Sequence, residues 1–357
     1  MTDPLPAGSR IGILGGGQLG RMLSMAAARL GCVCPIYDPA DAPPAGPVAG
    51  RVTSGTGHDL EALDAFARTV DVITYEFENV PAEAVDLIEG ICPVRPGRRA
   101  LAVSQDRLDE KDFLSGLGLR TAPYAPIDSL PDLETAVAVM ATPAILKTRR
   151  LGYDGKGQIR VDMPDQAAQA FRWLDGRPAV LEGYVEFAQE ISVIGARGVD
   201  GRVVCYDPGE NLHRDGILRT TTVPAGVPPA TATDAVLLTG RILNALEYVG
   251  VLAVELFVAE DGLVVNEIAP RVHNSGHWTQ NACIIDQFEQ HVRAICGWPL
   301  GNGRRHSDAT MINLIGHDVD DLSEYLEDGI HLYGKADVRD GRKMGHVNRI
   351  RPLGAAG

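Results

Sequence analysis

Short apolar runs alternate with helix-like spacing of apolar residues through the first hundred positions of the chain. The predicted strands cover residues 10–14, 33–37, 71–75 and 91–95. The predicted helices cover residues 20–30, 60–70 and 81–89. Alternation of strands and helices is typical of a parallel sheet with helices on its faces. The pattern therefore predicts an α/β domain over residues 1–104.

Strands dominate the pattern further along the chain. Residues 105–185 begin with a predicted charged helix at 105–114, which is followed by an extended proline-rich stretch. The other predicted elements of this part are strands at 144–148, 159–161 and 179–181 and a helix at 165–174. Beyond residue 185 they are strands at 190–196, 202–205, 251–258 and 263–268 and helices at 231–249 and 286–296. We therefore expect α+β architecture after the α/β part, with domains over residues 1–104, 105–185 and 186–357.

Composition excludes several classes of partner. Net charge is −14, from 33 basic and 47 acidic residues, whereas a nucleic-acid binder needs a basic surface for phosphate contacts. No stretch approaches the ~18 uncharged apolar residues of a membrane span, and the N-terminus has no apolar signal-peptide core. Six cysteines without a Cys-x-x-Cys pair are too sparse for a disulfide framework. We expect a cytoplasmic protein with no nucleic-acid or membrane partner.

The first candidate site is a glycine motif near the N-terminus. Gly15, Gly17 and Gly20 form a Gly-x-Gly-x-x-Gly pattern between a predicted strand and a predicted helix. This context is typical of a phosphate cradle at a helix N-terminus. Asp38 ends the next predicted strand, where dinucleotide-binding folds place a ribose-binding acid. One hypothesis is therefore NAD or FAD binding, and the other is a turn that binds a different phosphate or none.

A second glycine-rich loop, residues 152–158, joins two predicted strands, so we expect it to form a hairpin lid. Three glycines in seven residues let its backbone lie close to a charged ligand. Four cations lie in or beside it, at Lys147, Arg149, Arg150 and Lys156. On an acidic chain this cluster favours a polyphosphate bound under the lid. The alternative is an exposed hairpin without a ligand.

Two glutamates are predicted to face each other in the last third of the chain. The strand 251–258 is apolar except for Glu255. A three-residue turn at 260–262 connects it to the strand 263–268. This turn places Glu255 directly opposite Glu267, with Cβ atoms ~4.5–5.5 Å apart.

Such a pair needs a shared proton or a bound cation to offset the repulsion. Mg²⁺ takes one or two carboxylates together with phosphate oxygens, which links the pair to the cationic loop as a site for magnesium and a nucleotide. The alternative is a slip in strand register that turns one glutamate to solvent. Strict strand alternation would turn Asn266 to the opposite face from Glu267, so a role for Asn266 in this site depends on a local distortion of the strand.

Seven motifs spread over the whole chain are informative together. They are GGGQLGRM at 15–22, TYEFENV at 74–80, QDR at 105–107, GYDGKGQ at 152–158, NLHRDGI at 211–217, NEIAPRVHNSGH at 266–277 and LYGK at 332–335. In these motifs the chain resembles the ATP-grasp superfamily and, within it, the family of 5-(carboxyamino)imidazole ribonucleotide synthetases. The resemblance implies an ATP-grasp fold in which a Rossmann-like parallel-sheet domain precedes two α+β halves that hold ATP between them.

By matching motif, the resemblance also implies site residues. The implied nucleotide-binding residues are Arg107, Lys147, Gly152, Tyr153, Asp154, Gly155, Lys156, Gly157, Gln158, Glu182, Gly183, Tyr184, Val185, Glu190, His213, Asn266 and Glu267. Among them, 182–185 resemble the adenine hinge and Glu190 the ribose acid. The implied Mg²⁺ ligands are Glu255 and Glu267, the same two residues that the predicted turn places opposite each other.

The implied reaction uses ATP and bicarbonate to carboxylate the exocyclic amine of 5-aminoimidazole ribonucleotide, through carboxyphosphate. The implied catalytic residues are Arg271, His273, Tyr153, Asp154 and Lys156. The implied residues of the ribonucleotide site are Gln18, Glu76, Asn274, Lys335, Arg342 and Lys343. In that site Glu76 would take the ribose hydroxyls and the cations the 5′-phosphate. The family also suggests a homodimer.

Three rival functions stay open at this point. A nicotinamide-dependent oxidoreductase is suggested by residues 15–20 and Asp38. A non-catalytic nucleotide-binding module would bind Mg²⁺ and ATP without turnover. A sister ligase that formylates glycinamide ribonucleotide with formate would share the lid and metal motifs, but the motifs at 74–80 and 332–335 favour the imidazole substrate.

Overall fold

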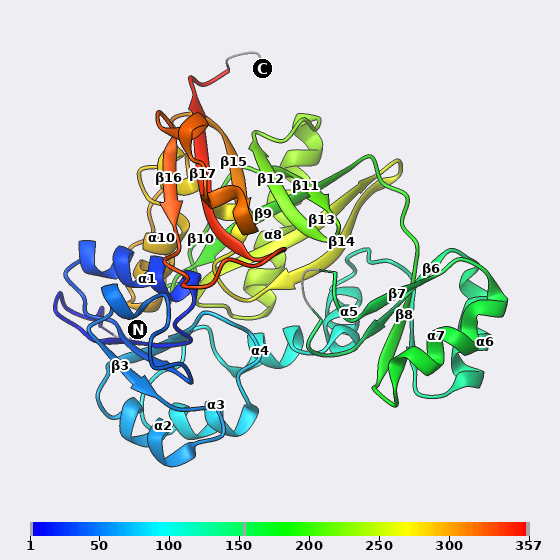
Figure 1. Ribbon diagram of the computed structural model, residues 1–357, viewed down its shortest axis with the longest axis horizontal. Helices are drawn as coiled ribbons and strands as arrows, with labels where there is room; N and C mark the ends of the chain where they lie inside the picture. Colours follow the sequence, from blue (N-terminus) through cyan, green and yellow to red (C-terminus); the bar gives the residue numbers. More distant parts are fainter. Residues whose placement is uncertain (1–2, 153–154, 355–357) are drawn as a thin grey trace.

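The computed structural model describes residues 3–152 and 155–354. These residues form one parallel sheet and two antiparallel sheets (Figure 1). The parallel sheet and the smaller antiparallel sheet lie on opposite sides of the large antiparallel sheet. In the described part of the chain, no helix is both long and apolar enough to cross a lipid bilayer.

The N-terminal sheet is parallel, with the strand order β3-β2-β1-β4. Its strands are β1 (Ile11–Leu14), β2 (Pro35–Asp38), β3 (Arg51–Ser54) and β4 (Val72–Tyr75). The helical segments of this part are α1 (Gln18–Arg29), η1 (Gly46–Val48), α2 (Leu60–Ala67), α3 (Ala82–Glu89) and α4 (Arg98–Ser104). Apolar β1 and β4 are fully buried, as expected for inner parallel strands. The predicted α/β architecture of this part is confirmed.

The two edges of this sheet differ from the prediction. The predicted strand 91–95 is wrong, since only Val94 pairs with the sheet, opposite Ile73. Pro93 lies within this run, and a residue without an N–H group cannot continue a ladder. Strand β3 was not predicted because its Arg-Val-Thr-Ser sequence lies at a half-exposed edge. An edge strand lacks the continuous apolar run of a buried parallel strand.

The smaller antiparallel sheet has the order β5-β8-β6-β7. Its elements are β5 (Tyr124–Ile127), α6 (Leu130–Met140), β6 (Ala144–Thr148), β7 (Gln158–Val161), η2 (Pro164–Gln166), α7 (Ala167–Leu174) and β8 (Ala179–Gly183). Helix α6 occupies part of the stretch predicted as extended. Ser129 caps it by accepting from the Asp132 N–H, and Pro131 lies in its first turn, where no N–H donor is required.

The large sheet is antiparallel, with the order β14-β13-β9-β11-β12-β15-β17-β16 and β10 beside β9. Its strands are β9 (Gln189–Arg197), β10 (Val203–Cys205), β11 (Gly209–Arg214), β12 (Ile217–Val223), β13 (Gly250–Ala259), β14 (Gly262–Ala269), β15 (Asp308–Ile315), β16 (Gly329–Leu332) and β17 (Lys343–Arg351). The accompanying helical segments are α5 (Arg107–Gly116), α8 (Pro229–Ala245), η3 (Asn274–Gly276), α9 (Thr279–Ala282), α10 (Gln287–Ile295), η4 (Gly316–Val319) and η5 (Ser323–Tyr325).

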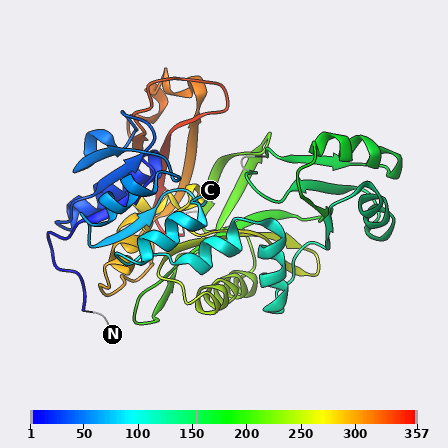
Figure 2. The same ribbon diagram turned by 90° about the horizontal axis from the view of Figure 1, so that it is seen from below.

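The hydrophobic cores show which parts are built together. Leu23 of α1 and Phe288 of α10 belong to one core, which joins the parallel sheet to the large sheet. Leu114 of α5 lies in a second core with Val254 of β13, so α5 packs with the large sheet. The smaller sheet has a core of its own around Leu146 and projects as a separate lobe (Figure 2). The domain limits after residues 104 and 185 remain a prediction.

Candidate active site

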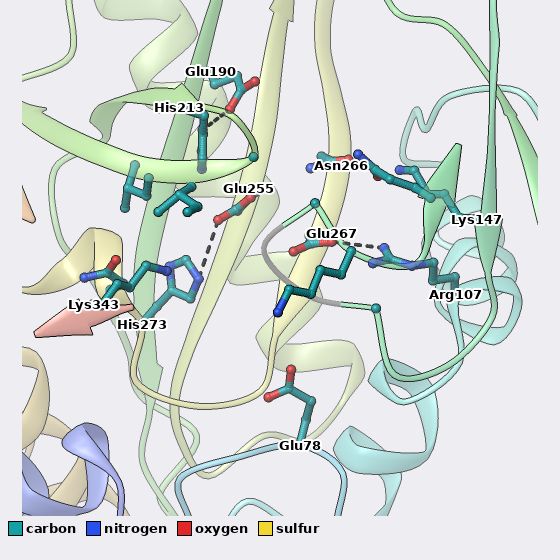
Figure 3. A pocket seen from close by; sticks show the side chains of 18 of the residues that line it. Glu78, Arg107, Lys147, Glu190, His213, Glu255, Asn266, Glu267, His273 and Lys343 are labelled. Atoms are coloured by element: carbon teal, nitrogen blue, oxygen red, sulfur yellow. Dashed lines mark hydrogen bonds and ion pairs between the residues drawn. The ribbon is translucent and has the colours of Figure 1, made fainter. Parts of the chain in front are cut away.

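A cavity of about 990 Å³ is lined by residues from all three sheets and their loops (Figure 3). Nearly all the residues predicted from the sequence meet there. They are Gln18, Glu76, Arg107, Lys147, Gly152, Gly155, Lys156, Gln158, Glu182, Gly183, Tyr184, Val185, Glu190, His213, Glu255, Asn266, Glu267, Arg271, His273, Asn274, Lys335, Arg342 and Lys343. Segments more than 300 residues apart in the sequence thus form one site.

Glu255 on β13 and Glu267 on β14 are direct cross-strand partners, as predicted. The predicted turn is wrong, because Ala259 pairs with Gly262 and leaves two residues in the turn instead of three. A bulge after Glu255 leaves Asn266 without a partner and shifts the register by one residue. The bulge therefore restores the glutamate pair that the shorter turn alone would have broken.

The bulge also changes where Asn266 points. Adjacent residues of a regular strand face opposite sides, whereas a bulge re-aims a side chain. Asn266 and Glu267 both line the cavity (Figure 3). The bulge is the local distortion on which the place of Asn266 depends, and it lets the strand offer an amide and a carboxylate to the same space.

The facing glutamates form an electrostatically strained pair. Burial, and then the charge of Glu267, raise the pKa of Glu255 to about 7. Arg107 Nη1 donates to Glu267 Oε2 at 3.1 Å. Among the described residues no group of three or more His, Cys, Asp or Glu side chains is arranged to hold a metal. Two facing carboxylates fit a hard cation such as Mg²⁺, which takes its remaining ligands from phosphates and water.

His213 and Glu190 form a second pair on the cavity wall. His213 Nδ1 lies 2.6 Å from Glu190 Oε2. Burial alone would lower the pKa of His213, but the Glu190 carboxylate outweighs it and raises that pKa. The register of β11 shifts between Leu212 and His213, directly before the side chain that contacts Glu190 of β9. Both residues line the cavity.

A buried triad lies behind the predicted adenine hinge. Glu182 Oε2 lies 3.0 Å from Lys147 Nζ and 3.2 Å from Lys111 Nζ. Burial alone would raise the pKa of Glu182, but the two ammonium groups lower it. Lys147 was predicted from the sequence and Lys111 was not, because Lys111 sits in a helix whose charged sequence suggests a solvent-exposed face. The triad fixes the carboxylate where β8 reaches the cavity.

The glycine-rich loop between β6 and β7 is a hairpin connection, as predicted. Gly152, Gly155, Lys156 and Gln158 line the cavity. Gly157 does not line it within the described residues: its carbonyl accepts from the Thr148 N–H at 2.8 Å. The predicted roles of residues 153 and 154 (Tyr153 and Asp154) lie outside the described residues.

Two of the four cations assigned to the loop have a different place. Arg149 Nε and Arg150 Nε bind Asp106 at 2.8 and 3.2 Å. Asp106 is also the N-cap of α5, where it accepts from the Leu108 N–H. The expectation that all four cations face a polyphosphate is therefore wrong for these two arginines. They fasten the base of the loop to α5.

The N-terminal glycine loop is occupied by the protein's own carboxylates. Glu76 accepts from the N–H groups of Gly17 and Gly20 at 2.8 and 2.9 Å. Asp38 accepts from the Gly16 N–H at 2.6 Å. A Cβ on Gly17 would meet Glu76 Oε1 at 2.2 Å, so glycine is needed to admit the carboxylate. The loop positions Glu76 at the cavity, and Asp38 faces the loop instead of a ribose.

Arg271 is held by a residue that was not predicted. Its Nε and Nη2 donate to the two oxygens of Glu78 at 2.5 and 3.3 Å. Burial alone would raise the pKa of Glu78, but the guanidinium lowers it. Glu78 follows β4 and Arg271 follows β14, so the pair joins the parallel sheet to the large one. The signal was present in the motif at 74–80, in which only Glu76 was selected.

The remaining predicted residues line the end of the cavity next to β15 and β17. Asn274 exchanges two side-chain hydrogen bonds with Asn313, at 2.9 and 2.8 Å. Lys335 Nζ donates to the carbonyl of Lys343 at 2.6 Å. Arg342 lines the cavity beside them. This end therefore gathers basic residues from the loop that leads into β17.

One more buried acid lies beside the Glu255–Glu267 pair. Glu110 of α5 accepts from the Ile268 N–H at 2.7 Å. Burial, and then the charge of Glu267, raise its pKa to about 8. Arg107, Glu110 and Lys111 occupy one helix face, since positions three and four apart are neighbours. From this face Arg107 contacts Glu267, Glu110 contacts the Ile268 N–H and Lys111 contacts Glu182. The helical spacing of the three charged residues was the sequence signal that could have identified Glu110 and Lys111.

The sequence matches three domain families in chain order. Residues 9–105 match the ribonucleotide synthetase preATP-grasp domain, residues 112–288 the ATP-grasp domain and residues 309–353 the phosphoribosylaminoimidazole carboxylase C-terminal domain. An N5-carboxyaminoimidazole ribonucleotide synthase of Brucella melitensis is 52% identical over 354 residues, 98% of each chain. This chain belongs to the N5-carboxyaminoimidazole ribonucleotide synthase family.

Solved structures of this family share the fold. A Staphylococcus aureus N5-carboxyaminoimidazole synthetase complexed with ADP has a TM-score of 0.94 at 35% identity, covering 98% of this chain and 95% of that chain. An Aspergillus clavatus N5-carboxyaminoimidazole synthase in complex with ADP and 5-aminoimidazole ribonucleotide has a TM-score of 0.91 at 30% identity, covering 97% and 94%. The predicted ATP-grasp fold with an N-terminal pre-ATP-grasp domain is confirmed, and membership of this ligase family does not favour a nicotinamide enzyme.

Proposed function

We propose that this chain is an ATP-dependent ligase that uses bicarbonate to carboxylate the exocyclic amine of 5-aminoimidazole ribonucleotide in purine biosynthesis. The supporting observation is the shared cavity. It joins the Lys147–Glu182 side, the Glu255–Glu267 pair and the basic end near Lys335. The similar Aspergillus clavatus protein is described with ADP and 5-aminoimidazole ribonucleotide bound, the two ligands that such a cavity must hold together.

The nucleotide is assigned to the side of the cavity between β8 and β14. Glu182 to Val185 would meet the adenine, with Glu182 held by its two lysines. Glu190 and His213, 2.6 Å apart, would meet the ribose. Arg107, Lys147 and the glycine-rich loop would neutralise the phosphates. Backbone N–H groups of a loop and positioned cationic side chains stabilise the transition state of phosphoryl transfer.

Magnesium is part of the proposal because the two facing carboxylates fit it. Glu255 and Glu267 would hold Mg²⁺, and the ion would reduce the negative charge of the nucleotide phosphates. Asn266 lies beside them at the bulge. Arg107, which donates to Glu267 Oε2 at 3.1 Å, would keep that carboxylate oriented.

The chemistry proceeds through carboxyphosphate. An oxygen of bicarbonate attacks the γ-phosphorus as the bond to ADP breaks. The anhydride then breaks at its carbon–oxygen bond, phosphate leaves, and the amine nitrogen bonds to the carbon and loses a proton. Arg271 and Lys156 would stabilise the anionic intermediate. Burial and the charge of Arg271 hold the pKa of His273 well below its usual range, so a neutral imidazole is available to orient bicarbonate.

The acceptor nucleotide is assigned to the end of the cavity next to the parallel sheet. Glu76, held by two backbone N–H groups, would take the ribose hydroxyls, with Gln18 beside it. Lys335, Arg342 and Lys343 would bind the 5′-phosphate, with Asn274 nearby. Tyr153 and Asp154 stay predicted partners of the reacting amine. A homodimer and a cytoplasmic location also remain predictions.

The test is an ADP-release assay with two pairs of substrates and the same enzyme. With Mg²⁺ and ATP, we expect ADP release to require both 5-aminoimidazole ribonucleotide and bicarbonate. Glycinamide ribonucleotide with formate should give only the background rate. Stimulation by the second pair alone would assign the chain to the formylating ligase, and stimulation by neither pair would leave a nucleotide-binding module.

A further inference from the structure

Gln287, the first residue of α10, is fully buried and grips the backbone of His273. Its Oε1 accepts from the His273 N–H at 2.9 Å, and its Nε2 donates to the His273 carbonyl at 2.7 Å. Nε2 also lies 3.0 Å from His277 Nδ1. One amide thus fixes both ends of the loop 273–277, with both of its N–H donors and its oxygen engaged.

The surrounding residues are fitted to this amide. A Cβ on Gly276 would lie 2.6 Å from Gln287 Oε1, so glycine leaves room for the side chain. The Gln287 N–H donates to Thr279 Oγ1 at 3.1 Å, and that hydroxyl donates to the Gly276 carbonyl at 2.6 Å. A buried amide with all its partners present is a rigid support, whereas a partner left unpaired would be costly.

The loop that Gln287 holds presents His273 to the cavity. His273 Nδ1 lies 2.9 Å from Ser275 Oγ, and Nε2 points to Glu255 Oε1 at 3.5 Å (Figure 3). We infer that Gln287 is a positioning residue that sets the place of the His273 imidazole beside Glu255. The inference rests on the proposed function, in which His273 orients bicarbonate. Gln287 itself does not line the cavity in the described structure.

The same helix supplies a matched control. Gln290 is also fully buried and grips a single residue in the same way. Its Oε1 accepts from the Gly301 N–H at 2.9 Å, and its Nε2 donates to the Gly301 carbonyl at 3.0 Å. Neither Gln290 nor Gly301 is among the described residues that line the cavity. Loss of Gln290 therefore reproduces the structural cost without touching His273.

The experiment compares Q287M with Q290M, since methionine keeps the length of glutamine and loses its hydrogen bonds. Thermal unfolding and the KM values for ATP, 5-aminoimidazole ribonucleotide and bicarbonate are measured for both variants and the wild type. We expect similar losses of thermal stability. Only Q287M should raise the KM for bicarbonate, by about tenfold or more, because a displaced catalytic group is costly, while its KM for ATP stays within about twofold.

Equal bicarbonate KM values for the two variants would overturn the inference. If Q287M does not fold, T279V is measured instead, since it removes the hydroxyl that anchors Gln287 and keeps the side-chain shape. T279V should raise the bicarbonate KM by a smaller factor, and an unchanged value would equally overturn the inference. A wild-type enzyme without bicarbonate-dependent ADP release would refute the proposed function instead, which separates the two failures.

Discussion

Glu255 and Glu267 face each other across β13 and β14 because a bulge at Asn266 compensates for a two-residue turn. The pairing is costly without a cation, as the pKa of Glu255, raised to about 7, indicates. The bulge keeps the two carboxylates opposite each other despite their repulsion, which favours a site for a ligand that offsets their charge. The pair is therefore the part of the cavity to which we assign Mg²⁺ and the nucleotide phosphates.

Glu267→Gln should reduce kcat by at least ~10²-fold, because the proposed metal contact and the charge that orients Arg107 would both be lost. Steady-state ADP release measures the effect. Glu260→Gln, an exposed position in the turn of the same hairpin, is the control and should behave as the wild type. Near-normal turnover in the Glu267 variant would refute the metal assignment.

Glu110 should make the protein less stable as the pH rises. Its pKa is raised from 4.5 to about 8 in the folded protein, first by burial and then by the charge of Glu267. Between these values the folded state binds more protons than the unfolded state, so the free energy of unfolding falls with increasing pH. Urea unfolding at about pH 5 and about pH 8 should show a smaller fall for Glu110→Gln than for the wild type.

The control for this measurement is Glu134→Gln, an exposed position on α6, which should keep the wild-type pH dependence. A Glu110 variant whose stability changes with pH as much as the wild type would contradict the burial argument.

Lys111→Met should weaken both stability and ATP binding. The Lys111 and Glu182 side chains are 2% and 5% exposed, and the change leaves a buried carboxylate with Lys147 as its ammonium partner. We expect the free energy of unfolding to fall by about 2 kcal/mol or more and the KM for ATP to rise. Arg99→Met, exposed on α4, should change neither value. An unaltered KM for ATP in the Lys111 variant would show that the triad does not support the nucleotide site.

Glu78→Gln should lower turnover through Arg271. The amide cannot offer two charged acceptors to the guanidinium, so the bidentate pair at 2.5 and 3.3 Å is weakened. We expect kcat to fall about tenfold or more, with circular dichroism confirming an intact fold. Glu83→Gln, exposed on α3, serves as the control. Equal kcat values for the two variants would remove Glu78 from the account.

The sequence predicted the inner strands of the parallel sheet and the pairing of Glu255 with Glu267, because both carry strong local signals, but it did not predict strand β3 or the two-residue turn. Residues 72–75 and 251–258 are mostly apolar and are therefore visible as strands, although Glu255 interrupts the second run. Strands β11 and β17 were not predicted, since polar and charged residues outnumber the apolar ones in both, His213 and Lys343 at the cavity among them. Polar residues that serve a site thus hide the strands that carry them.

The residues that line the cavity were predicted better than the residues that hold them in place. Motifs identify the groups that face the cavity, such as Arg271 and His273. The supporting residues Glu78 and Gln287 lie 193 and 14 positions away from these groups, and no periodic pattern links them. The glycine loop at 15–20 was misleading for a related reason. Its N–H groups looked ready for a phosphate, and the fold gives them to Glu76.

The most direct test of the central claim follows the oxygen and carbon atoms of bicarbonate. The enzyme is supplied with Mg²⁺, ATP, 5-aminoimidazole ribonucleotide and bicarbonate labelled with ¹³C and ¹⁸O, and the products are followed by ¹³C and ³¹P NMR. We predict that the ¹³C carboxyl appears on the exocyclic nitrogen and that each released phosphate carries one ¹⁸O from bicarbonate. Phosphate without the label, or ADP formed without a ¹³C-labelled product, would contradict the account.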